Sequence, residues 1–162
     1  MYTRFCAGLS KLCLMLAVAL LLLVIVSVQW QVFGRYVLND TPTWAEALAM
    51  LLVLFVTALG LAVGVRDAGH IGLESMVALL PERWQRRVEL LIHALVGLFG
   101  ALMVSGGWTW ASGKWAEKKP MLPVPDGIDY VPLIIAGVLI VLFSIEHIIA
   151  NLQGRVVEPS WN

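Results

Sequence analysis

Four long stretches of the chain are almost free of charged residues, and polar segments separate them. The second stretch shows the pattern most clearly, because the nineteen residues between Glu46 and Arg66 carry no charge. A helix rises ~1.5 Å per residue, so about 20 apolar residues cross the ~30 Å hydrocarbon core of a bilayer. The pattern therefore predicts four membrane-spanning helices, over about residues 12–34, 44–65, 84–111 and 130–152.

A shorter segment, about residues 70–80, has a different pattern. Its apolar residues recur at helical spacing and continue into the third span, at Leu73, Met76, Val77, Leu80 and Trp84. Such a helix is too short and too polar to cross a bilayer, so we expect it to lie in the membrane plane. The predicted fold class is an all-α integral membrane protein, with four transmembrane helices, this amphipathic helix, and one membrane domain over residues 1–162.

The composition supports a membrane protein and argues against other classes. Hydrophobic residues make up 60% of the chain and charged residues 14%, whereas soluble domains have about 45–50% and about 25%. The formal net charge of zero gives no sign of nucleic-acid binding, which needs clustered Lys and Arg. We find no nucleophile beside a base, no metal-spaced Cys/His cluster and no phosphate-binding glycine loop. We therefore expect neither enzymatic activity nor a cofactor in this chain.

Aromatic and basic residues indicate the orientation. Tryptophans, which favour membrane interfaces, fall near the predicted span ends, at Trp30, Trp44, Trp84, Trp108, Trp110 and Trp115. The side that holds both termini carries seven basic residues, which are Arg4, Lys11, Arg66, Arg83, Arg86, Arg87 and Arg155. The other side carries four, which are Arg35, Lys114, Lys118 and Lys119. The positive-inside rule then predicts both termini in the cytoplasm and the proline-rich loop 112–129 outside a bacterial inner membrane.

Four ionisable residues lie inside the predicted spans and away from the span ends. Glu89 and His93 share one face of the third helix, and Glu146 and His147 lie at a similar depth in the fourth. An unpaired charge in a bilayer is costly, so we expect these groups to meet. They can form a polar clasp that joins the two helices, or that joins either helix to another protein. Arg86 or Arg87 could reach into this clasp. They can also form a proton relay.

A third interpretation makes His93 and His147 the axial ligands of a b-type haem, as in membrane anchors of respiratory enzymes. The alternative function is therefore a haem-bearing or quinone-linked anchor subunit. The other candidate function is that of an accessory subunit of a transporter. The uncharged runs contain no proline interruption of the kind at which transporters bind substrate, so we expect no transport by this chain alone.

Further candidate residues lie around the second helix. Thr43 and Glu46 have the spacing of a capping box, and Glu46 could instead form an ion pair across a subunit interface, with Arg35 as one candidate partner. Gly60 and Gly64 form a small-residue face that allows close approach of a helix, from this chain or another. His70 is either solvated, a helix cap or a polar contact to a partner.

The order of several short motifs resembles a known family. Arg35-Tyr36 closes the first helix, Trp44-x-Glu46 opens the second, and a short charged exit leads to His70-Ile71-x-Leu73. With four spans, this order resembles the small membrane subunit of tripartite ATP-independent periplasmic (TRAP) transporters over nearly the whole chain. Many members continue as Trp-x-Glu-Glu, whereas this chain has Ala47, so no role of a second carboxylate carries over.

The resemblance implies a scaffold beside two other proteins. A large polytopic membrane subunit moves a carboxylate, such as a C4-dicarboxylate or a sialic acid, by an elevator-type mechanism driven by sodium that the large subunit binds, and a periplasmic binding protein delivers the substrate. Candidate partner contacts are Arg35, Tyr36, Trp44, Glu46, Gly60, Gly64, Arg66, His70, Glu89, His93, Glu146 and His147. Candidate contacts to the binding protein are Lys114, Lys118, Lys119 and Asp126.

Overall fold

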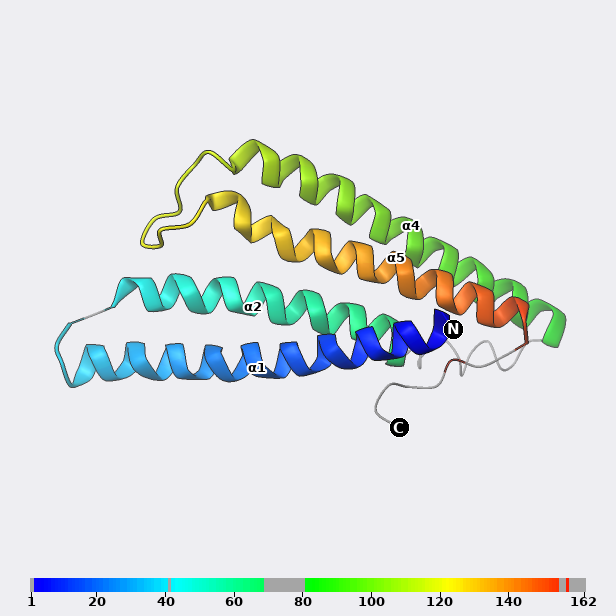
Figure 1. Ribbon diagram of the computed structural model, residues 1–162, viewed down its shortest axis with the longest axis horizontal. Helices are drawn as coiled ribbons and strands as arrows, with labels where there is room; N and C mark the ends of the chain where they lie inside the picture. Colours follow the sequence, from blue (N-terminus) through cyan, green and yellow to red (C-terminus); the bar gives the residue numbers. More distant parts are fainter. Residues whose placement is uncertain (1, 41, 69–80, 155–156, 158–162) are drawn as a thin grey trace.

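The computed structural model describes residues 2–40, 42–68, 81–154 and 157. Its four long helices form two antiparallel hairpins, α1 with α2 and α4 with α5 (Figure 1). All four are long and apolar enough to cross a membrane, as predicted. The amphipathic helix predicted over residues 70–80, including His70, lies outside the described residues. The helices are α1 (Tyr2–Tyr36), α2 (Thr43–Val63), α4 (Glu82–Lys114) and α5 (Val131–Leu152).

Helix α1 extends well before the charge-free run that revealed it. Cys6, Ser10 and Cys13 follow each other at intervals of four and three residues, so they share one helix face, and all three are buried. Arg4 and Lys11 lie on other faces and are exposed. Arg4 and Lys11 mark where the predicted span begins, but the helix itself begins earlier, at Tyr2.

The connection between α1 and α2 is a tight turn. The Asp40 amide donates to the Gly34 carbonyl at 3.0 Å, and Asn39 adopts a positive φ of 51°. A Cβ on Gly34 would lie 2.8 Å from Pro42 Cδ, so the close approach requires glycine here. The residue that precedes α2 is Pro42, and no side chain caps the helix. The predicted capping box is therefore wrong, because Thr43 is already the first helical residue and cannot act as the cap.

Helices α4 and α5 approach each other through glycines. A Cβ on Gly137 would lie 2.6 Å from the Gly100 carbonyl oxygen, and a Cβ on Gly100 would lie 2.9 Å from the Gly137 oxygen. The two backbones are therefore in direct contact, as small residues permit. Gly60 and Gly64 on α2 do not pack in this way, since a Cβ on either would meet nothing within 4 Å among the described residues. Their packing partner is thus not another described helix of this chain.

The two hairpins converge at one end and diverge at the other (Figure 1). They converge where α1 and α4 begin and where α2 and α5 end, and we call this the basic end; the opposite end is the loop end. The Tyr2 hydroxyl donates to the Leu142 carbonyl at 2.9 Å, so α1 begins opposite the middle of α5 and the hairpins are staggered. The apolar core between them includes Leu59, Ala62, Val63, Leu139, Ile140 and Phe143.

Candidate functional site

Helix α2 ends in one π-helical turn, η1 (Gly64–Ala68), which positions two charged residues. A π turn is wider than an α turn, so successive side chains diverge by a smaller angle, and such turns are frequent at functional sites. Here both Arg66 and Asp67 point into the bundle, with 3% and 8% of their surface exposed. The charged exit that the sequence placed at the membrane surface is therefore buried.

The Arg66 guanidinium lies between two carboxylates. Its Nε donates to Glu146 Oε2 at 2.9 Å and its Nη2 to Glu146 Oε1 at 3.1 Å, while Nη1 donates to Asp67. This fork geometry suits a carboxylate better than a single ammonium does. Glu146 has no exposed surface, and Ser10 Oγ on α1 donates to Asp67 Oδ2 at 2.6 Å. The ion pairs therefore connect η1 with α5, and the Ser10 hydrogen bond adds α1.

Two histidines extend this cluster to α4. His147 Nε2 lies 3.0 Å from the Arg66 carbonyl oxygen and donates to it, so α5 holds both the side chain and the backbone of that residue. The His147 ring stacks on His93 of α4, with centroids 4.4 Å apart and planes 8° apart. One turn nearer the basic end, Asn151 Nδ2 donates to Glu89 Oε2 at 2.6 Å. We call Ser10, Arg66, Asp67, His93, Glu146 and His147 the buried polar cluster.

The physical role of such a cluster is specificity more than net stability. Desolvating charges offsets most of their attraction, so a buried ion pair is often no more stable than a well-packed apolar replacement. Removing only one partner is different, because it leaves an uncompensated charge and costs about 3–5 kcal/mol. The buried polar cluster therefore favours the one arrangement of the two hairpins in which Arg66 meets Glu146.

The structure differs from the sequence prediction in the identity of the cation. His93 and His147 meet at matched depth, and Glu146 lies beside them. Arg86 and Arg87, which we expected to reach this clasp, are exposed, and Arg66 takes their place. The contact between Arg66 and Glu146 could not be predicted from sequence spacing, because the π turn directs Arg66 inward. No sequence pattern indicates that turn. Glu89 joins Asn151, a residue that we did not single out.

The haem interpretation does not fit this geometry. In a bis-histidine site each imidazole aims a ring nitrogen at an iron that lies between them, with the porphyrin plane separating the rings. His93 and His147 instead stack face to face at 4.4 Å. That separation is van der Waals contact, so no macrocycle fits between the rings without moving α4 from α5.

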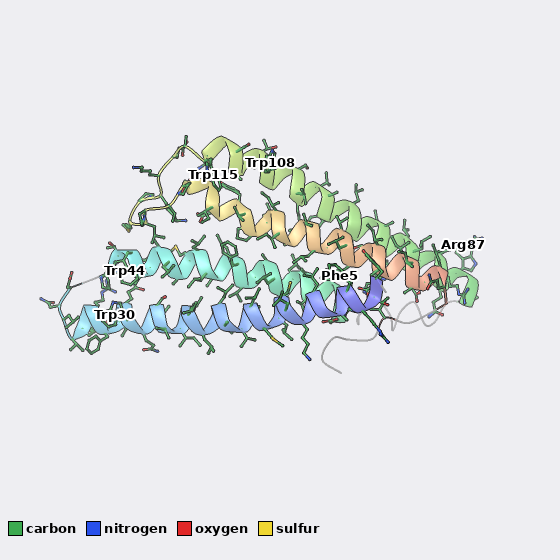
Figure 2. All side chains as sticks on the ribbon, in the orientation of Figure 1. Phe5, Trp30, Trp44, Arg87, Trp108 and Trp115 are labelled. Atoms are coloured by element: carbon green, nitrogen blue, oxygen red, sulfur yellow. The ribbon has the colours of Figure 1, made fainter. Side chains whose placement is uncertain are left out.

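Other candidate residues lie on the surface at or near the loop end. Arg35, Tyr36 and Trp44 are exposed. No ion pair joins Arg35 to Glu46 in the part of the chain that the structure describes, and the exposed Glu46 accepts a long hydrogen bond of 3.5 Å from Gln31 Nε2. Side chains such as Trp30, Trp44, Trp108 and Trp115 are visible near this end in Figure 2. These residues are therefore accessible to another protein or to lipid.

The loop between α4 and α5 is folded and cross-linked by charges. Lys114 pairs with Asp126 at 3.2 Å, and Lys119 pairs with Asp129. Backbone bonds close the loop, from the Lys119 amide to the Val124 carbonyl at 3.0 Å and from the Asp126 amide to the Glu117 carbonyl at 2.8 Å. Of the four docking candidates, three are thus paired within the loop, and Lys118 is exposed.

Comparisons with known proteins identify the family. The family described as "Tripartite ATP-independent periplasmic transporters, DctQ component" matches residues 24–154. The sialic acid TRAP transporter small permease protein SiaQ of Vibrio cholerae is 31% identical over 78 residues, which cover 48% of this chain and 45% of SiaQ. The C4-dicarboxylate TRAP transporter small permease protein DctQ of the same species is 25% identical over 104 residues, covering 61% and 44%.

A third relative is much longer. The sialic acid TRAP transporter permease protein SiaT of Haemophilus influenzae is 33% identical over 73 residues, which cover 43% of this chain but only 12% of SiaT. The matches to SiaQ and DctQ also span less than half the length of those relatives. The family match itself covers most of the chain. This membrane protein, whose described residues form four helices of membrane-spanning length, therefore belongs to the DctQ component family of TRAP transporters, whose members are transport components and not enzymes.

Proposed function

We propose that the chain is the small membrane subunit of a TRAP transporter that takes up a carboxylate solute. Relatives named for sialic acid and for C4-dicarboxylates support a carboxylate. The match to 12% of SiaT supports a larger partner, because in that relative a segment similar to this chain is joined to a much longer permease. In this proposal the large subunit binds both the solute and the driving sodium ions, and this chain holds no cofactor.

The observation that carries the scaffold role is the location of the buried charges. Apart from Lys11, which is exposed next to Ser10 on α1, the helices α1, α2, α4 and α5 contain no charged residue between the buried polar cluster and their last turns at the loop end. An ion or proton path needs polar groups along its length. The cluster therefore fixes the packing of the helices, and transport proceeds through the partner.

We assign the contact with the large subunit to the outward face of α2. Glu46 and Gly64 are eighteen residues, or five helical turns, apart, so they share a face with Gly60 close by. Glu46 and Gly60 are exposed, and both glycines have open space above them. A helix of the partner can approach α2 closely there. The basic end faces the cytoplasm in this proposal, and the folded loop at the loop end faces the periplasmic binding protein.

Co-purification tests the proposal. The chain carrying Gly60→Leu and Gly64→Leu should recover much less of the large subunit, while its helicity and thermal stability stay unchanged. Gly106→Leu is the matched control, because a Cβ on Gly106 of α4 also meets nothing within 4 Å. Undiminished recovery with the α2 variant would place the interface elsewhere. Failure of the wild-type chain to recover any large membrane subunit would contradict the function itself.

A further inference from the structure

The basic end of the α4–α5 hairpin carries two arginines that pair with no carboxylate among the described residues. Arg86 and Arg87 are both exposed, and no ion pair involves either of them in the described part of the chain. Glu89, the next carboxylate along α4, is bound by Asn151 instead. Because α1 begins opposite Leu142, this end of the hairpin also projects beyond the start of α1. Both positive charges therefore lie at this projecting end.

A tryptophan orients one of these arginines. The Arg87 guanidinium carbon lies 5.6 Å from the centre of the Trp84 ring, within cation–π range, and Trp84 is 57% exposed. Figure 2 shows Arg87 near the start of α4, at the basic end. Arg86 lies across the end of α5, where its Nη2 is 3.8 Å from the position of a Cβ on Gly154. Tryptophan is typical of the headgroup region, so the arginines are at that depth.

An apolar stripe continues from this pair along α4. Leu91, Leu95 and Leu98 follow Trp84 and Arg87 at intervals of three and four residues, which places them on the same helix face. Each of these leucines is more than half exposed, at 59%, 56% and 58%. From Arg87 to Leu98 the helix rises about 16 Å, roughly half of the ~30 Å hydrocarbon thickness. The stripe therefore matches the length of one bilayer leaflet.

We propose that Arg86, Arg87 and Trp84 bind the phosphate of an anionic phospholipid, whose acyl chain lies along Leu91, Leu95 and Leu98. Guanidinium groups bind phosphate oxygens through paired hydrogen bonds. Two exposed cations favour a lipid with net negative charge over a zwitterionic one. The exposed leucines favour a lipid over an acidic protein segment, because they extend the site into the hydrocarbon region. Charge, depth and shape thus agree on one ligand class.

Native mass spectrometry of the purified full-length chain tests this site. The protein is held in detergent micelles containing equal amounts of phosphatidylglycerol and phosphatidylcholine, and the lipids retained after detergent release are counted. The wild-type chain should retain phosphatidylglycerol preferentially. Each basic residue at headgroup level contributes roughly a five-fold factor, so Arg86→Gln with Arg87→Gln should weaken that binding about 30-fold. Arg87→Lys keeps the charge but loses the guanidinium contact with Trp84, so its loss should be smaller.

The matched control removes two exposed basic residues from the other hairpin at the same end, Arg4→Gln with Lys11→Gln. It should keep the preference for phosphatidylglycerol. Equal losses in the two double variants would mean a general charge effect and would overturn the site. Full lipid retention by the Arg86/Arg87 variant would overturn the site as well. If the same variant also recovered less of the large subunit in the co-purification, the arginines would bind protein and not lipid.

Discussion

Arg66 and Glu146 are 80 positions apart in the chain, and two hydrogen bonds of 2.9 and 3.1 Å join their side chains across the two hairpins. Each residue belongs to a different hairpin, so the contact fixes how the hairpins meet. His147 strengthens it by donating to the Arg66 backbone. This pair therefore joins the two hairpins near the basic end of the bundle.

Replacing Arg66 alone should destabilise the fold strongly. Arg66→Met leaves Glu146 and Asp67 buried without their cation, and we expect the free energy of unfolding to fall by about 3–5 kcal/mol. The measurement is a denaturant titration of helicity in mixed micelles. Adding both Glu146→Met and Asp67→Asn should recover much of the loss, because all three buried charges are then gone. A loss no larger than that of Arg4→Met, which removes an exposed arginine, would contradict the role of the pair.

Adding a methyl group between α4 and α5 should also cost stability. In Gly137→Ala the new Cβ would lie 2.6 Å from the Gly100 oxygen and 2.8 Å from Val104 Cγ2, so the helices must separate. We expect a loss of about 1–3 kcal/mol in the same titration. Gly106→Ala, in open space on α4, should be neutral or slightly stabilising, since alanine favours helix. Equal behaviour of the two variants would mean that the backbones are not in contact.

The stacked histidines predict a spectrum without haem. Rings in face-to-face contact at 4.4 Å cannot hold a macrocycle between them. The chain, purified from cells supplied with haem precursor, should therefore lack a Soret absorption band. A band that disappears in both His93→Ala and His147→Ala would show bis-histidine ligation and refute the geometry.

The ion pairs of the loop should support uptake by keeping the loop folded, whichever partner of a pair carries the positive charge. Lys119→Asp places a second carboxylate beside that of Asp129, and the two repel each other. We therefore expect the loop to open and uptake by the assembled transporter to fall. The swap that adds Asp129→Lys restores an ion pair and should restore uptake. The effect on global stability should be at most ~1 kcal/mol, as for most partly exposed pairs. If the swap fails to rescue uptake, Lys119 contacts the binding protein directly.

The four helices could be predicted because a bilayer imposes simple rules. Each span needs about 20 apolar residues, and the tryptophans and charges mark where the spans end. The family could also be identified from the order of Arg35-Tyr36, Trp44-x-Glu46 and the charged exit after α2. These are features of single segments, which a sequence records directly.

The contacts between segments were harder to predict. Arg66 was assigned to the membrane surface, and only the π turn of η1 shows why it points inward. Gly60 and Gly64 fit the small-residue pattern better than Gly100 and Gly137, yet the latter pair forms the backbone contact. Periodicity identifies a helix face but does not say which partner it meets. A buried Glu146 does require a nearby cation, and that requirement was the one available signal for Arg66.

We propose that this chain supports transport without conducting it. The most direct test is uptake of labelled sialic acid and of a labelled C4-dicarboxylate into proteoliposomes under a sodium gradient. The chain alone, the large subunit alone, and both together are each assayed with the binding protein outside. We predict uptake of one solute only when both membrane subunits are present. Uptake by the chain alone, or an undiminished rate without it, would show that the chain is not a supporting subunit of this transporter.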